Sequence, residues 1–214
     1  MNLTRSYYRV STFLVLLCWA VGAGSTCQAS NQVVSVEEHW ELKVSQPESD
    51  RSAPQITMVM SPKNGLDGEH ILLTLNHATD PDYAAGGIQL QVWDGEEHVE
   101  SHSEHDGEAL NHDDETITWV QRVSLNDGQL TFQIVNGQSE SWGSFGGESL
   151  SHSMSTTIGN LNSYRPGVSI SESQVSYAEN RVVSLVLTKL VWVTEDGEVH
   201  EQNAPIPVDT SLDE

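Results

Sequence analysis

The chain has little cysteine and little positive charge. Its 214 residues include two cysteines, Cys18 and Cys27, and nine Lys or Arg against 31 Asp or Glu. Both cysteines lie within the first thirty residues, so the rest of the chain can form neither a disulfide nor a cysteine-based zinc site. The folded part must therefore rely on a hydrophobic core, and roughly 185 residues are enough for one domain with such a core.

Long hydrophobic runs are scarce as well. One apolar run, Thr12–Ala23, follows Arg5 and Arg9 and precedes small residues up to Ala29. This order is typical of a secretory signal peptide, so we expect residues 1–29 to be one, cleaved after Ala29 or after Ala23. An uncleaved membrane anchor is the alternative, which a run of about a dozen residues disfavours because ~20 are needed to span a bilayer. We expect the protein to be secreted, or periplasmic or on the cell surface, with no membrane span after cleavage.

The shortage of positive charge excludes whole classes of partner. Beyond residue 29 the chain has seven basic and 31 acidic residues, a net charge of −24. Nucleic acids need a basic footprint that releases counterions, and anionic lipid surfaces attract basic segments, so we expect neither as a partner. Cations and a protein partner stay open. A very acidic surface is also typical of solvation in a salty medium, and that interpretation stays open too.

Apolar residues recur at every second position through most of the chain, which is typical of half-buried strands. Asn126-Asp127-Gly128 and Asn136-Gly137 separate such runs and indicate hairpin turns. No helical periodicity of convincing length occurs beyond the first thirty residues. The predicted strands cover residues 34–44, 56–60, 71–75, 88–92, 117–125, 130–134, 154–158, 168–170, 175–177, 182–193 and 198–201.

These strands predict an all-β fold: a single antiparallel β-sandwich, jelly-roll or lectin-like, over residues 30–202, with a closed barrel as the alternative. Trp40 and Trp119 fall on the apolar faces of their strands and are expected in the core. Residues 203–214 contain proline and acid, and we expect a disordered acidic tail there.

A histidine-rich acidic stretch, Asp94–Glu115, is the first candidate site. Imidazole and carboxylate are ligands for zinc, copper or nickel, so His98, His102, His105 and Asp106 are the candidate ligands. In an extended chain His98 and His102 share a face and His105 points the other way. The spacing matches no strict metal motif, and a solvated loop or edge hairpin is the alternative.

A glycine-rich loop at residues 136–147 is the second candidate. Trp142 and Phe145 are flanked by glycine, and Asn136 and Glu140 offer hydrogen bonds nearby. An aromatic platform with a few polar groups is typical of a glycan site, so a surface glycan is the most concrete ligand expected. The alternative is that both rings fold back and cap one end of the sandwich.

A third candidate is a cluster of oxygen ligands. Asn76, Asp80 and Asp82 supply carboxylate and amide oxygens of the kind that calcium prefers, although no EF-hand pattern is present. A simple Asp-Pro turn is the alternative.

No catalytic signature stands out. The chain has no Gly-x-Ser-x-Gly elbow, no phosphate-binding loop and no dinucleotide fingerprint. We therefore expect an exported, non-catalytic β-sandwich that acts as a binding or structural module and requires no cofactor, with calcium or zinc as candidate ions. One alternative is a carbohydrate-active hydrolase, which needs two carboxyl groups about 5–10 Å apart in a groove. Another is a metal-binding protein that uses the histidine-rich stretch.

Overall fold

The computed structural model describes residues 31–45, 54–76, 86–110, 112, 114–176, 181–203 and 205–210, all within the unit Asn31–Glu214. The predicted signal peptide, Asp80 and Asp82 lie outside these residues. In the described part, no helix has the length and apolarity needed to cross a membrane.

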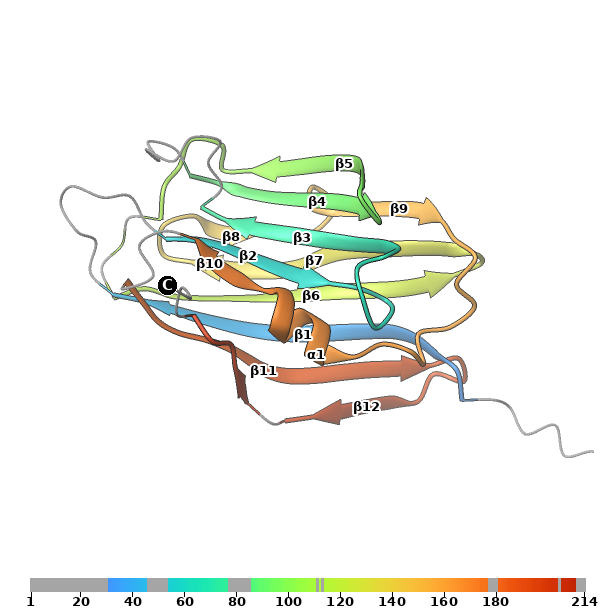
Figure 1. Ribbon diagram of the computed structural model, residues 1–214. Coiled ribbons are helices and arrows are strands. Elements are labelled where there is room, and N and C mark those ends of the chain that lie inside the picture. The colour runs from blue at the N-terminus through green and yellow to red at the C-terminus, as the bar shows by residue number, and fades with distance from the viewer. Residues whose placement is uncertain are drawn as a thin grey trace, which may run out of the picture. The chain divides into compact units, whose positions relative to one another are not determined.

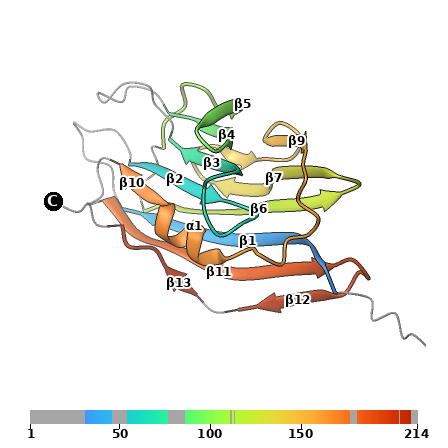
Figure 2. The same ribbon diagram turned by 45° about the vertical axis from the view of Figure 1, so that its right-hand side comes forward.

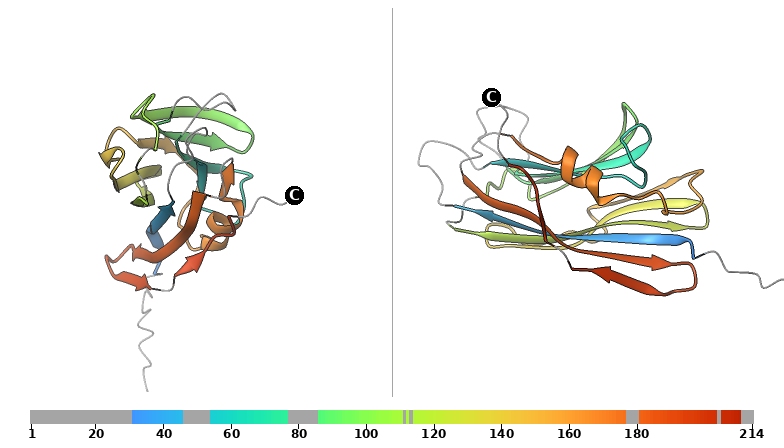
Figure 3. Two further views of the ribbon diagram at one scale, coloured as in Figure 1. Left: turned by 90° about the vertical axis from the view of Figure 1, so that its left-hand side faces the viewer. Right: turned by 60° about the horizontal axis from the view of Figure 1, so that its bottom comes forward.

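Two antiparallel sheets form separate layers (Figures 1 and 3). The eight-stranded sheet has the order β12-β11-β1-β6-β7-β8, with β13 beside β11 and β9 beside β7. The five-stranded sheet has the order β10-β2-β3-β4-β5. The sheets do not close into a barrel, so the predicted all-β sandwich is confirmed. The strands are β1 (Val33–Val44), β2 (Gln55–Met60), β3 (Glu69–Leu75), β4 (Ile88–Asp94), β5 (Glu97–Glu104), β6 (Thr116–Asn126), β7 (Gln129–Ser139), β8 (Gly143–Phe145), β9 (Ser151–Ser155), β10 (Gln174–Ser176), β11 (Val182–Thr194), β12 (Val199–Gln202) and β13 (Ile206–Pro207).

The core fills the space between the two layers. Trp40 of β1 and Trp119 of β6 are directly opposite each other, each 1% exposed, and their rings stack at 6.2 Å. The predicted core position of both tryptophans is therefore confirmed. Alternate residues of β2, β3 and β4 close the core from the other sheet, because side chains of a strand point to its two faces in turn.

Two expectations about local structure are corrected. Residues 168–170 were predicted as a strand but lie in the helix α1 (Pro166–Glu172), whose first turn contains a proline. Proline is favoured there because it has no N–H to leave unpaired. The helix lies beside β2 (Figure 2), and the residue that follows it, Ser173, accepts a hydrogen bond from the Val59 backbone N–H.

The second correction concerns the tail predicted to be disordered from residue 203. Within it, β13 pairs with β11, and the backbone N–H of Val208 donates to the carbonyl of Leu185. Val208 is 7% exposed and belongs to the core. An apolar residue after Pro207 thus anchors part of the acidic tail.

Candidate functional site

On the edge strand β5, the side chains of Glu100 and His102 face the other sheet. His102 is paired with Leu90 and Glu100 with Val92, and both partners are fully buried. Directly opposite residues in an antiparallel pair point to the same face, so His102 and Glu100 face the space between the sheets. Where the neighbouring strand β4 has leucine and valine, β5 therefore has ionisable groups.

The edge strand β9 of the other sheet supplies the matching side chain. His152 is paired with the fully buried Phe132 of β7, so it too points inward. Nδ1 of His152 lies 3.1 Å from Oε2 of Glu100 and 3.5 Å from Nε2 of His102. One ligand atom from each of the three residues lies within 4.8 Å of the other two. The cluster joins two strands from different sheets at one edge of the sandwich (Figure 2).

The distances between the ligand atoms of this cluster suit a metal ion with tetrahedral coordination. With metal–ligand bonds of about 2.05 Å, neighbouring ligand atoms in a tetrahedral zinc site lie about 3.3 Å apart. The distances of 3.1 and 3.5 Å from Nδ1 of His152 to its two neighbours in the cluster bracket that value. Two imidazoles and one carboxylate suit zinc or copper and do not suit calcium, which prefers oxygen ligands. Three protein ligands leave a fourth position for water.

The burial of the cluster is graded. The His152 side chain is 14% exposed, whereas Glu100 is 52% exposed. The imidazole is thus held in the interior while the carboxylate reaches solvent. A metal ion in solution can therefore reach the imidazole nitrogens by way of the exposed carboxylate.

Next to the cluster, a direct polar contact already ties the two sheets together. Glu104, on the same face of β5, accepts a hydrogen bond from the Gly146 backbone N–H at 3.0 Å and another from the Ser149 hydroxyl. Both donors belong to the connection between β8 and β9. This contact places the strands that carry His102 and His152 beside each other.

Of the metal ligands predicted from sequence, only His102 belongs to this cluster. A bulge between Val92 and Trp93 changes the register, and His98 packs edge-on against Trp93 and lies 2.8 Å from the Ser101 hydroxyl. His105 and Asp106 lie in the turn after β5, where His105 has a φ of 56° and contacts Glu108 at 3.0 Å. Among the described residues, His98, His105 and Asp106 therefore do not join His102 in a metal-ligating group.

Sequence reasoning missed Glu100 and His152. Glu100 is one of many acidic residues in its stretch, so its type alone carried no signal. His152 lies fifty residues from His102. Only the pairing of β9 with β7 brings it to β5. His152 lies two residues before the predicted strand 154–158, in phase with Met154, and this was the one usable hint.

The aromatic platform predicted for a glycan is also corrected. Trp142 and Phe145 are each 5% exposed, and their rings pack edge to face at 6.4 Å. The indole N–H of Trp142 donates to the carbonyl of Glu108 at 2.8 Å. Large rings gain more from burial than from exposure, so both cap one end of the sandwich and their faces are not presented to a ligand.

A buried carboxylate organises the same loop. Glu115 is fully buried and accepts hydrogen bonds from the backbone N–H groups of Glu140 and Ser141, at 2.6 and 3.0 Å. Asn136 and Glu140 are exposed, as expected for ligand contacts. Glu140 lies 3.5 Å from His112, and Asn136 lines a separate shallow depression beside Phe145. The four predicted glycan contacts therefore do not converge on one site.

Asn76, the calcium candidate within the described residues, has a structural role. It is fully buried, and its side chain accepts a hydrogen bond from the Leu110 N–H and donates one to the Pro54 carbonyl. An amide oxygen engaged in this way holds two loops together.

A second ionisable group lies in the core, in the middle of the apolar face of β1. Glu38 is fully buried and accepts hydrogen bonds from the Tyr164 hydroxyl, the Trp40 indole and the Gln121 amide. Burial raises the pKa of Glu38, and these hydrogen bonds offset part of the rise. Burial, followed by the charge of Glu38, raises the pKa of Tyr164 well above its usual value.

The fold and the site together define an antiparallel β-sandwich with a two-histidine, one-carboxylate group between its sheet edges. No protein-family model and no curated protein matches this chain. Function must therefore be argued from the site itself, and the hydrolase alternative stays a prediction.

Proposed function

We propose that this protein is an exported β-sandwich that binds a transition-metal ion, zinc or copper, between Glu100, His102 and His152. The observation that carries the proposal is the convergence of two imidazoles and a carboxylate at ligand-to-ligand spacing, from strands of different sheets. Export is part of the proposal because of the leader pattern in residues 1–29.

The acidity of the chain supports this function. A net charge of −22 attracts cations to the surface and raises their local concentration near the exposed carboxylate of Glu100. The imidazoles then provide selectivity, because sodium, calcium and magnesium prefer oxygen ligands. The proposal assigns binding to the site and no turnover.

Isothermal titration of the metal-free full chain with zinc tests the proposal. We expect one zinc ion per chain, and at least tenfold weaker binding in His102→Ala and in His152→Ala, because loss of supporting groups alone costs about 10–100-fold. His98→Ala is the matched control, since it removes a histidine from the same strand but outside the cluster, and its affinity should equal that of the wild type. Equal affinities in all four proteins would reject the site.

A further inference from the structure

A groove on the far side of the sandwich has the properties of a second, independent ligand site. Its floor is the inner face of β1, β11 and β12, where Trp192 is paired with the buried Val36 and Gln202 with Leu190. Its wall is the segment 161–166, which leads into α1 and includes its first residue. The volume of about 270 Å³ lies just below the ~300–1,000 Å³ of drug-sized pockets, so the groove suits a single ring.

Trp192 gives the groove an aromatic surface. It is half-buried, and one face of its indole stacks on His200 at 5.4 Å with an interplanar angle of 15°. Only the opposite face can therefore meet a ligand. Within the described residues, the Trp192 N–H and the exposed Gln202 amide have no hydrogen-bond partner, and both are open to a ligand or to water.

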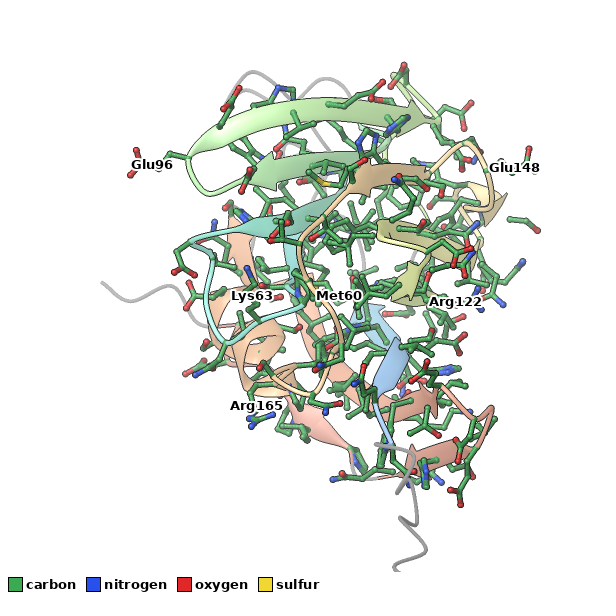
Figure 4. All side chains as sticks on the ribbon, turned by 90° about the vertical axis from the view of Figure 1, so that its right-hand side faces the viewer. Met60, Lys63, Glu96, Arg122, Glu148 and Arg165 are labelled. Carbon is green, nitrogen blue, oxygen red and sulfur yellow. The ribbon has the colours of Figure 1, made fainter. Side chains whose placement is uncertain are left out.

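Arg165 places a positive charge at the rim of the groove, away from any carboxylate of the described residues. In the described part of the chain, the other exposed or half-exposed cations each lie near a carboxylate, as in the pairs Lys43–Glu41, Lys63–Glu69, Arg122–Glu37 and Lys189–Glu201. Arg165 has no carboxylate at ion-pair distance there, and donates only to the carbonyls of Asn162 and Tyr164. Figure 4 shows it extending from the start of α1, well separated from Arg122.

A guanidinium without an acidic partner is unexpected in a chain with 31 acidic residues. Its five donors match a carboxylate, and two carbonyls do not use them all. The groove therefore combines an aromatic face, amide groups and an unpaired cation, whereas its remaining lining is mainly apolar.

We propose that this groove binds a sugar acid. The sugar ring packs on Trp192, and its carboxylate pairs with Arg165. Its hydroxyls meet the Gln202 amide and the NH2 group of Asn162, whose Oδ1 already accepts from the Val33 N–H. The amides favour a sugar over an aromatic acid, which has no hydroxyls to satisfy them. This site is separate from the metal cluster and does not rest on it.

An NMR titration of the ¹⁵N-labelled full chain, in the presence of a chelator, tests the proposal. The probes are glucuronate, its neutral counterpart methyl glucoside, and benzoate. The readout is the indole N–H resonance of Trp192, assigned by its loss in Trp192→Phe. We expect a saturable shift with glucuronate and binding about tenfold weaker for methyl glucoside, because a charge-assisted hydrogen bond is lost.

Variants at the rim isolate the role of the charge. Arg165→Gln should weaken glucuronate binding about tenfold, and Arg165→Lys, which keeps the charge and loses the planar fork of donors, should restore only part of it. Lys43→Gln removes the same charge from another exposed position and should leave binding unchanged. The proposal is overturned if glucuronate gives no saturable shift, if benzoate binds and glucuronate does not, or if Lys43→Gln weakens binding as much as Arg165→Gln.

Discussion

At the scale of single residues, the buried carboxyl of Glu38 shapes the stability of the core. Its burial raises its pKa in the folded state above the value of about 4.5 that it has when exposed. The folded protein therefore holds this proton more tightly than the unfolded chain. The stability from this group is fully present below pH ~4.5 and is lost as the pH rises through the folded-state pKa.

Glu38→Gln removes this titration while keeping the shape of the side chain. The carbonyl oxygen of the variant can still accept from Tyr164, whereas its NH2 group replaces the oxygen that accepts from Trp40 and Gln121, a loss that does not change with pH. We expect the variant to gain stability relative to the wild type as the pH rises from 5 to 8. Urea unfolding at a series of pH values measures this, and a difference that stays constant or reverses would contradict it.

The packing of the Phe145 ring against Gly137 can be tested by substitution at that glycine. A Cβ at this position would lie 2.2 Å from the ring of Phe145, so any side chain displaces that ring. We expect Gly137→Ala to lower the free energy of unfolding by about 1–3 kcal/mol, the usual cost of overpacking. Gly159→Ala, where a Cβ meets nothing within 4 Å, is the control and should change stability by less than ~0.5 kcal/mol. Equal effects in a thermal melt would show that Phe145 yields freely.

At the scale of elements, the period-two pattern predicted most strands because it reports which face is buried. It predicted β1 and β3 nearly to their ends, and the Asn-Asp-Gly turn between β6 and β7, where Asp127 and Gly128 have φ values of 48° and 73°. It did not predict β5, because five consecutive residues there, 97–101, are exposed and give no alternation.

The candidate site was only partly predictable for the same reason. His102 was identified because it lies in a histidine-rich stretch. His152 and Glu100 join it only through the placement of two sheet edges, which local sequence does not encode. The groove at Trp192 was missed because its wall, segment 161–166, comes from an irregular connection.

A metal ion at the cluster would join β5 and β9, the neighbouring edge strands of the two sheets. Zinc at about 100 times its dissociation constant should stabilise the fold by about 2.7 kcal/mol and raise the melting temperature by several degrees. Amide hydrogen exchange should slow in both strands. His102→Ala should lose the thermal shift and His98→Ala should keep it. A shift that persists in His102→Ala would place the zinc elsewhere.

At the scale of the whole molecule, mutual repulsion among the acidic residues opposes the compact state. The chain carries a net charge of −22, and the Debye length falls from about 30 Å at 0.01 M salt to 3 Å at 1 M. We expect the melting temperature to rise as sodium chloride increases over that range. Chloride is preferable to sulfate, which also stabilises proteins by exclusion from their surface. A flat or falling melting temperature would show that the charges are already neutralised locally.

The position of a bound zinc ion in a crystal is the sharpest test of the proposed metal site. Crystals soaked with zinc and measured at wavelengths on either side of the zinc absorption edge locate the ion without reference to any variant. We predict an anomalous peak between β5 and β9, about 2.0–2.2 Å from Nε2 of His102, Nδ1 of His152 and a carboxylate oxygen of Glu100. A peak confined to His98 or His105, or no peak at the cluster, would contradict the account.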